Sequence, residues 1–554
     1  MLDHASTRTR IGIITHGSLG SGLEMKLHAS EAVEHVKAGR FVVVEGDRHD
    51  FFAMITDIRI DAANENILLN PPAPEEELLR LVLQGTGTYA TVSLKPMLMM
   101  PNTRHPEFAQ AAAQPVKTVP AHFSLVAEAD EEDVARIFGA EANEDGTRWF
   151  EVGQPLDMEE IPVCLDLAAF VERSNAVFGK TGTGKSFLTR LLLSGLIKTG
   201  RAVNLVFDMH GEYGMKALTE GAEQSVRGLK SLFPERVLIF SLDPATTRRR
   251  GSSADEEVYI YADQIEPDDI LPLQDTLRLN PTAAESTYLL RQKLGKNWLG
   301  RLLQAEGDEI NELAAECGAN EQSVSALYRK LSRLKGLGFF KTESVRQRHD
   351  VLDALLEAID AGKSVVFEFG EHKSLLVYLL VANVITRRLR DRYEDRVNQY
   401  LASQKEADKP QQLVITIEEA HKFLGPGVAR ETPFGKIARE MRKFFVSLLV
   451  VDQRPSGIDE EVLSQIGTKV VAQLNDDKDI SAALVGTRDS SALRQVLAAL
   501  DSKQQALLLG HAVPMPIVVK TRTYGPEFYK AMQADRPGAG QTATDMRDTM
   551  HELF

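Results

Sequence analysis

The stretch Gly179-Lys-Thr-Gly-Thr-Gly-Lys-Ser186 decides the fold, because it matches the pattern G-x-x-x-x-G-K-S without a gap. The apolar run Ala176-Val-Phe178 comes directly before it, and a helical pattern over residues 186–198 follows and ends at Gly200. A strand, a glycine-rich turn and a helix in this order form a phosphate-binding loop, whose backbone N–H groups and helix N-terminus face the phosphates. The sequence therefore predicts a nucleotide-binding protein of the P-loop class.

Two side chains of this loop have separate predicted roles. Lys185 reaches the β- and γ-phosphates, and the hydroxyl of Ser186 ligates Mg²⁺, so ATP and Mg²⁺ are the predicted cofactors. The predicted nucleotide-binding residues are Gly179, Lys180, Thr181, Gly182, Thr183, Gly184, Lys185, Ser186 and Phe187.

A loop of this kind works with an acid at the end of a neighbouring strand. The apolar run over residues 413–417 ends in Glu418-Glu419-Ala-His421. Because neighbouring side chains of a strand point to opposite faces, the two acids are expected to divide their roles. We predict that Glu418 binds Mg²⁺ through water and that Glu419 polarises the attacking water. The alternative is that both acids only favour the first turn of a helix.

Two further strand ends are expected at the same edge of the sheet, because ligands of open α/β sheets gather at the carboxyl ends of the strands. One is Val206-Phe-Asp-Met-His-Gly-Glu-Tyr213, and the other is the apolar run 447–451 followed by Asp452-Gln453. Gln453 is a candidate sensor of the γ-phosphate. Asp208 and Gln453 are equally compatible with structural caps.

Three arginines are candidate fingers for the nucleotide of another subunit. Arg173 precedes the strand of the loop, whereas Arg439 and Arg442 lie on a predicted helix between the acidic strand and Gln453. The planar guanidinium suits the oxygens of a transferring phosphate. The alternative is a solvated helix face with charge pairs one turn apart.

Short apolar runs separated by helical patterns predict an α/β fold with a RecA-like P-loop NTPase core. Most runs are apolar throughout, as expected for the strands of a largely parallel sheet that is covered on both faces. The predicted core strands are residues 176–178, 203–207, 237–240, 365–369, 413–417, 447–451, 470–472, 506–509 and 517–520.

Two regions depart from this pattern. Before residue 100, β-branched runs at residues 10–15, 23–27, 40–45, 51–60 and 91–97 alternate with turn residues and predict a small N-terminal β-barrel. Residues 285–304, 308–317, 320–334 and 350–359 predict helices of an inserted helical bundle. The expected parts are a barrel over residues 1–120, the core over 121–282 and 362–530, the bundle over 283–361, and a tail over 531–554. The tail is expected to latch onto another subunit, and the alternatives are a frayed terminus or a dock for a partner.

Composition sets the broad class. The 554 residues include 64 Lys and Arg against 79 Asp and Glu, a net charge of −15, so a wholly basic nucleic-acid coat is excluded but a locally basic channel is not. The two cysteines fit a reducing compartment, and the longest apolar runs, 374–386 and 506–519, are too short to cross a bilayer. We therefore expect a cytoplasmic protein with no membrane contact.

Taken together, these strings resemble the HerA branch of the HerA/FtsK family of hexameric DNA-pumping ATPases. The resemblance rests on residues 173–186, Phe207-Asp-Met-His-Gly-Glu-Tyr213, Glu418-Glu-Ala-His421, residues 437–443 and Gln453-Arg-Pro-Ser456. The strings Arg10-Ile-Gly-Ile-Ile-Thr-His-Gly-Ser-Leu-Gly20 and Phe51-Phe-Ala-Met-Ile-Thr-Asp57 are similar to the small barrel that opens HerA proteins.

The resemblance implies a homohexameric ring with ATP between subunits, double-stranded DNA in a central channel, and a NurA-type or other nuclease as partner. The implied enzyme is an ATP-driven DNA translocase or helicase that processes DNA ends in recombinational repair or in defence against phages. Two alternatives stay open: a nucleotide-gated scaffold for a nuclease, and an ATPase of the conjugation or secretion type. The basic residues expected near DNA are Arg430, Lys436, Arg439, Lys443 and residues 248–250.

Overall fold

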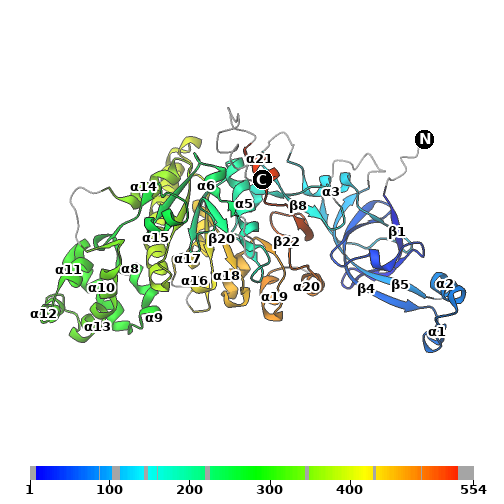
Figure 1. Cartoon of the computed structure of the whole chain (residues 1–554), viewed down its shortest axis with the longest axis horizontal. Coiled ribbons are helices and arrows are strands. Elements are labelled where there is room, and N and C mark those ends of the chain that lie inside the picture. The colour runs from blue at the N-terminus through cyan, green and yellow to red at the C-terminus, as the bar shows by residue number, and fades with distance from the viewer. Residues whose placement is uncertain are drawn as a thin grey trace. The chain divides into compact units, whose positions relative to one another are not determined.

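The structure is a computed structural model that describes residues 8–86, 88–102, 113–141, 147–158, 160–218, 225–342, 349–427, 429, 432–487 and 490–533. The chain divides into two compact units (Figure 1). The first unit comprises residues 1–185, 452–456 and 463–522, and the second comprises residues 186–451, 457–462 and 523–554. Most of the predicted tail, residues 534–554, and Arg430 lie outside the described residues.

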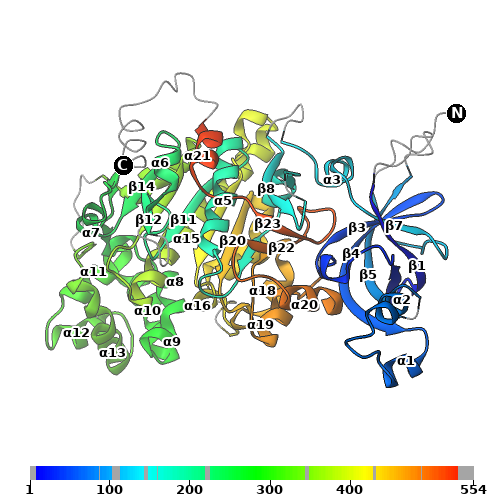
Figure 2. The same cartoon turned by 45° about the vertical axis from the view of Figure 1, so that its right-hand side comes forward.

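The first unit opens with a closed barrel of antiparallel strands (Figure 2). Its strands are β1 (Arg10–Ser18), β2 (Gly22–Leu27), β3 (Phe41–Glu45), β4 (His49–Ala62), β5 (Thr88–Pro101) and β7 (Leu125–Glu128), with the short β6 (Gln114–Pro115) at the edge of β5. The barrel closes because β2 pairs with β5 as well as with β1. Strand β7 pairs with β1 and β3, so the barrel sheet extends beyond residue 120.

The barrel forms because alternate side chains of its strands share one apolar interior. Met25, Val42, Ile55, Val92 and Val126 are all completely buried in it. The predicted barrel is therefore confirmed.

The remaining strands of the first unit surround the strand of the phosphate loop. They are β8 (Trp149–Pro155), β9 (Val163–Asp166), β10 (Asn175–Phe178), β21 (Thr468–Val471), β22 (Gln505–Gly510) and β23 (Ile517–Thr521). Strand β10 runs parallel to β21, while β21, β22, β23, β8 and β9 pair antiparallel in that order. Strands β8 and β9 were not predicted, because β8 alternates polar and apolar residues and resembles none of the fully apolar core runs.

The second unit contains a buried parallel sheet. Its strands follow the order β14 (Val237–Ser241), β18 (Ser364–Glu368), β11 (Val203–Asp208), β19 (Leu413–Glu418) and β20 (Val446–Asp452), and β20 ends where the chain passes into the first unit. The register pairs Asp208 with Glu368 and Phe207 with Ile417. The carboxyl ends of β18, β11 and β19 therefore carry three acids side by side: Glu368, Asp208 and Glu418.

Helices α5 (Lys185–Thr199) and α15 (Leu375–Ser403) are the long helices that accompany these strands. The first half of α15 is apolar and buried, and its second half is rich in arginine. Among the described residues, no helix is long and apolar enough to cross a membrane.

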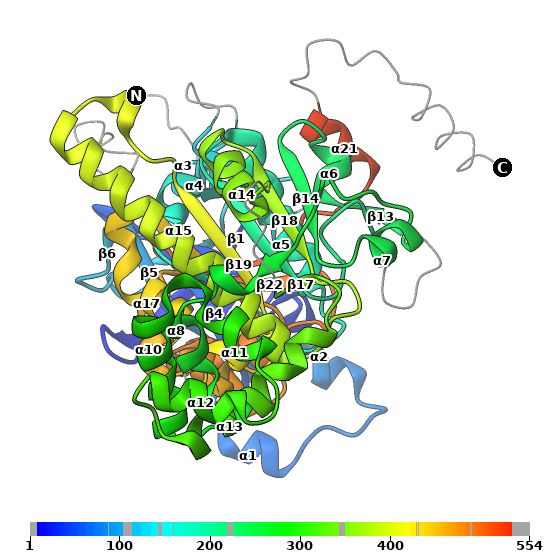
Figure 3. The same cartoon turned by 90° about the vertical axis from the view of Figure 1, so that its left-hand side faces the viewer.

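The inserted helices gather in one group of the second unit (Figures 1 and 3). They are α10 (Pro281–Leu294), α11 (Trp298–Gln304), α12 (Glu309–Glu316) and α13 (Glu321–Leu331). Helix α14 (Val351–Asp360), which was predicted as part of the bundle, instead packs on β18 and α15. The predicted single helix over 285–304 is wrong, because a 3₁₀ turn at Gly295–Asn297 separates α10 from α11. The buried Trp298 follows this turn, and its Nε1 donates to the carbonyl of Ile265 at 2.9 Å.

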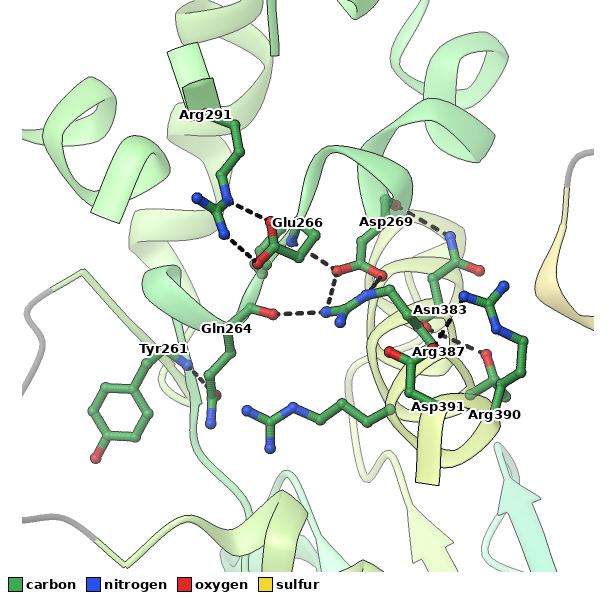
Figure 4. Close-up of polar contacts among 12 residues, drawn as sticks. Tyr261, Gln264, Glu266, Asp269, Arg291, Asn383, Arg387, Arg390 and Asp391 are labelled. Carbon is green, nitrogen blue, oxygen red and sulfur yellow. Dashed lines mark hydrogen bonds and ion pairs between the residues drawn. The ribbon is translucent and has the colours of Figure 1, made fainter. Parts of the chain in front are cut away.

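A group of polar side chains, here called the anchor network, joins the segment that precedes this insertion to α15 (Figure 4). Arg387 donates from Nε and Nη2 to the carboxylate of Asp269 at 2.9 and 2.8 Å, and Nη2 also donates to the carbonyl of Gln264 at 2.9 Å. The amide of Asn383 donates to the backbone carbonyl of Asp269 at 3.2 Å. Asp269, in α8 (Pro267–Ile270), is only 1% exposed, so its charge is compensated inside the protein.

Candidate nucleotide-binding and hydrolysis site

The phosphate loop of the first unit has the backbone shape that its glycines predict. Gly182 and Gly184 have φ values of +81° and +89°, which residues with a side chain rarely adopt. The loop begins at the end of β10, where the N–H of Gly179 donates to the carbonyl of Asp452 at 3.3 Å. Helix α5 starts at Lys185, so its first N–H groups face the loop.

The loop is closed from within by two side chains. Lys185 donates from Nζ to the carbonyl of Lys180 at 3.0 Å, and the buried hydroxyl of Thr183 donates to the same oxygen at 2.7 Å. The positive charge of Lys185 therefore lies against the concave backbone of the loop, the position that suits the oxygens of a phosphate chain.

The predicted sensor Gln453 lies directly on the loop. The hydroxyl of Thr181 donates to Oε1 of Gln453 at 2.6 Å, and Lys180 donates from Nζ to Asn475 at 3.3 Å. Gln453 is thus more than a cap of its own strand, because its side chain bonds a residue of the phosphate loop.

Glu418 ends strand β19 in the second unit and is buried, with 6% of its surface exposed. The hydroxyl of Tyr213 donates to its Oε1 at 2.8 Å, while Oε2 has no hydrogen-bond partner among the described residues. Burial raises the pKa of Glu418 well above its usual range, and the nearby charge of Asp208 raises it further. A buried acid with one oxygen left over suits a cation or its water shell.

Asp208 plays the structural role that was the alternative for it. Its carboxylate accepts the N–H groups of Gly211, Glu212 and Tyr213 at 2.7, 3.0 and 2.9 Å and so fixes the turn that follows β11. Burial raises the pKa of Asp208, and the three N–H groups oppose that rise.

Glu419 differs from its neighbour in both backbone and exposure. Its φ is +49°, a left-handed conformation that is uncommon outside glycine, and its side chain is 22% exposed. Its Oε2 lies 3.8 Å from Nε2 of His421. The structure thus separates the two consecutive acids into a buried one and an accessible one, and the strained backbone at Glu419 is the kind of outlier that active sites retain.

Comparison with known proteins agrees with this geometry. A family model described as the central domain of helicase HerA matches residues 150–389, and a model of the HAS barrel domain matches residues 11–118. A probable DNA double-strand break repair helicase HerA of Methanocaldococcus jannaschii is 32% identical over 394 residues, which are 67% of this chain and 75% of that protein. The chain belongs to the HerA helicase family.

A more distant HerA relative spans nearly the whole chain. The DNA double-strand break repair helicase HerA of Sulfolobus acidocaldarius is 23% identical over 503 residues, which are 88% of this chain and 89% of that protein. The likeness therefore includes both the barrel and the P-loop core of this HerA-family chain.

The three candidate arginines of this HerA-family chain are placed differently from one another. The prediction that Arg439 and Arg442 lie on one helix is wrong for Arg442, because α17 (Pro433–Glu440) stops before it. Met441–Phe444 forms a 3₁₀ turn that Phe445 ends with a φ of +62°. Arg439 is half-buried on α17, and Arg442 is exposed on the turn. Arg173 is exposed in the first unit, with its aliphatic stem against Gly467.

In the second unit, the guanidinium of Arg190 lies against the rings of Phe187 and Tyr524. Arg190 is 2% exposed, its guanidinium lies 4.7 Å from the ring centre of Phe187 and 5.3 Å from that of Tyr524, and its Nε donates to the carbonyl of Ser186 at 3.2 Å. Phe187 was a predicted binding residue, whereas Arg190 and Tyr524 were not. No short motif contains both, so local patterns carried no signal for this stack.

Sequence reasoning also missed Tyr213 as a partner of Glu418 and Glu368 as a third strand-end acid. Glu368 is 5% exposed and accepts a hydrogen bond from Thr247 at 2.7 Å; burial and then the charge of Asp208 raise its pKa to about 7. The signal was present, since Val365-Val-Phe-Glu368 has the same form as the strand that ends at Glu418.

The residues fit Mg²⁺ and ATP as predicted partners. Among the described residues no group of three or more His, Cys, Asp or Glu side chains forms a metal cage. Mg²⁺ does not require such a cage, because it is usually held by one or two protein ligands, several waters and the phosphates of a substrate. The unpartnered Oε2 of Glu418 and the hydroxyl of Ser186 are suitable protein ligands for such a site.

Proposed function

We propose that this chain is an ATP-dependent DNA helicase or translocase that works as a hexameric ring. The observation that carries the proposal is the phosphate loop of residues 179–186 in a member of the HerA helicase family. The two relatives described above are named as a DNA double-strand break repair helicase and a probable one, and duplex DNA is the substrate proposed here.

In the proposed hydrolysis, five side chains have separate roles. Lys185 balances the charge of the β- and γ-phosphates, and Ser186 and Glu418 hold Mg²⁺, which when bound neutralises charge that develops on the phosphates. Glu419 orients the attacking water and takes its proton. Gln453 exchanges its bond with Thr181 for a contact with the γ-phosphate.

Assembly completes the proposal. An arginine from the adjacent subunit meets the transferring phosphate, and the exposed Arg442 and Arg173 and the half-buried Arg439 are its candidates. The exposed Lys436 and Lys443 and residues 248–250 contact the DNA backbone. The proposed partner is a NurA-type or other nuclease that processes DNA ends, and the proposed location is the cytoplasm.

The test is ATP turnover by the full-length protein, with and without duplex DNA. We expect stimulation by DNA, loss of turnover in Lys185→Ala, and a fall of at least about 10²-fold in Glu419→Gln with ATP binding retained. The matched control is Glu440→Gln, which makes the same change at an exposed acid at the end of α17 and should keep wild-type turnover.

Three outcomes would contradict parts of the proposal. Wild-type turnover in Glu419→Gln would remove the role of Glu419. Turnover that ignores DNA would favour a nucleotide-gated scaffold or a conjugation-type ATPase. Light scattering that finds a fully active monomer would remove the ring.

A further inference from the structure

We infer that Tyr213 is a positioning residue for Mg²⁺, because its hydroxyl fixes the orientation of Glu418. The hydroxyl donates to Oε1 of Glu418 at 2.8 Å, and both residues are buried, with exposures of 0% and 6%. The hydrogen bond occupies one carboxylate oxygen and leaves Oε2 as the oxygen without a partner among the described residues. The inference rests on the proposed function and adds a residue to it.

The position of Tyr213 is itself fixed from the backbone. Its N–H donates to Oδ2 of Asp208 at 2.9 Å, and Oδ1 of Asp208 accepts the N–H groups of Gly211 and Glu212. The turn is therefore tied to the end of β11, and the tyrosine reaches from it to the end of the neighbouring strand β19. A carboxylate that is held on one side by a hydroxyl has one orientation, whereas a free carboxylate rotates about its last torsion.

This arrangement matches a general property of metal sites. Side chains that bond the protein ligands of a metal orient those ligands, and their removal typically lowers metal affinity or activity 10- to 100-fold. Tyr213 makes that kind of bond to Glu418, while a second buried tyrosine, Tyr378 on α15, does not. Tyr378 is 0% exposed, and burial and then the charge of Glu418 raise the pKa of its hydroxyl. In the described part of the chain this hydroxyl nevertheless donates no hydrogen bond to that carboxylate.

The experiment compares Tyr213→Phe with Tyr378→Phe in the full-length protein. Each change removes one buried phenolic hydroxyl and keeps the ring. Mn²⁺ replaces Mg²⁺ as the probe, and electron paramagnetic resonance measures its binding in the presence of a non-hydrolysable ATP analogue. We expect Tyr213→Phe to weaken Mn²⁺ binding about tenfold, to leave metal-free binding of the analogue unchanged, and to raise the Mg²⁺ concentration for half-maximal turnover to a similar extent. Tyr378→Phe should bind Mn²⁺ within about twofold of wild type.

A double variant separates positioning from a general loss of structure. If Tyr213 acts through Glu418, the change Tyr213→Phe should have no further effect on Mn²⁺ binding in a Glu418→Gln background. Melting temperatures of all variants are measured first, and the titrations are run well below the lowest of them.

The outcomes separate the inference from the function on which it rests. Wild-type Mn²⁺ affinity in Tyr213→Phe overturns the inference, as does an equal loss in Tyr378→Phe. A wild-type protein that binds the analogue without any dependence on metal instead removes the proposed function.

Discussion

Two groups of buried carboxylates in the second unit are treated in opposite ways. In the anchor network, Asp269 is paired with the guanidinium of Arg387 (Figure 4). At the strand ends, Asp208, Glu368 and Glu418 are similarly buried, but none of them forms an ion pair with another residue in the part of the chain that the structure describes. Both sets of carboxylates lie in the same unit and are similarly buried. They differ in whether a positively charged side chain pairs with them.

The comparison separates a buried carboxylate that has a counter-charge from one that has none. Burial raises the pKa of Asp269, and its hydrogen bonds and ion pair with Arg387 oppose that rise. Glu418 has no such cation among the described residues, and its neighbour Asp208 adds repulsion to burial. A buried carboxylate without a counter-charge destabilises the folded protein until a cation arrives. Oε2 of Glu418 thus suits a cation, whereas the carboxylate of Asp269 is already paired with a guanidinium.

The largest effect is expected from breaking the paired group. Arg387→Ala leaves Asp269 buried without its cation, and we expect the free energy of unfolding to fall by about 3–5 kcal/mol. Urea denaturation at constant pH measures this change. The double change Asp269→Leu with Arg387→Met should recover most of the loss, because a buried ion pair that is replaced by apolar groups of similar size is often neutral. A loss in the double variant as large as in the single one would mean that the pair contributes more than mutual compensation.

The unpaired Glu368 should make the stability of the folded protein depend on pH. The pKa of Glu368 is raised to about 7 from an ordinary 4.5, so the folded protein binds this proton more tightly than the unfolded chain. The contribution to stability is complete below pH 4.5 and is lost as the pH rises through 7, a difference of about 3 kcal/mol.

Glu368→Gln tests this expectation, because the amide cannot ionise and its oxygen still accepts from Thr247. At about pH 8 the variant should be more stable than the wild type by up to about 3 kcal/mol, and near pH 4.5 the two should be similar. Thermal unfolding across this pH range gives both values. Parallel curves for variant and wild type would show that Glu368 keeps an ordinary pKa.

Much of the fold was predictable because it depends on patterns of residues that are close together in the sequence. The phosphate loop, the apolar strands and the pair Glu418 and Glu419 each follow from residues that are adjacent in the chain. The helix predicted over 320–334 forms as α13 (Glu321–Leu331), and its Val324, Leu327 and Leu331 are completely buried. Strand β8 was missed because its polar residues alternate with apolar ones, which is also typical of an exposed strand.

The contacts within the site were less predictable, because they join residues that are far apart in sequence. Tyr213 and Glu418 are separated by 205 positions, and Asp269 and Arg387 by 118. The indole of Trp298 likewise reaches a distant backbone carbonyl, that of Ile265. Periodicity predicts that a residue is buried, but the partner that it meets depends on the order of strands and helices in space.

The smallest effect on stability is expected at an exposed ion pair, where charge compensation has little value. Arg248 on α7 (Pro244–Arg249) pairs with Glu257 at 2.8 Å, and the two side chains are 68% and 44% exposed. Because water screens such a pair, Arg248→Ala should change the free energy of unfolding by no more than about 0.5 kcal/mol. Urea denaturation, run as for Arg387→Ala, measures the change, and a loss of several kcal/mol would contradict the comparison between paired and exposed charges.

The same substitution should act differently on DNA binding, because residues 248–250 are proposed to contact the DNA backbone. Loss of one phosphate contact should weaken duplex binding uniformly across sequences and reduce the slope of log K against log salt by about 1. Arg59→Ala is the matched control, since Arg59 forms a similar exposed pair with Glu24 at 2.6 Å on the barrel. Fluorescence anisotropy with a labelled duplex, between about 50 and 200 mM salt, measures both slopes. An unchanged slope in Arg248→Ala would remove this residue from the DNA-binding surface and leave its pair with Glu257 as an ordinary surface contact.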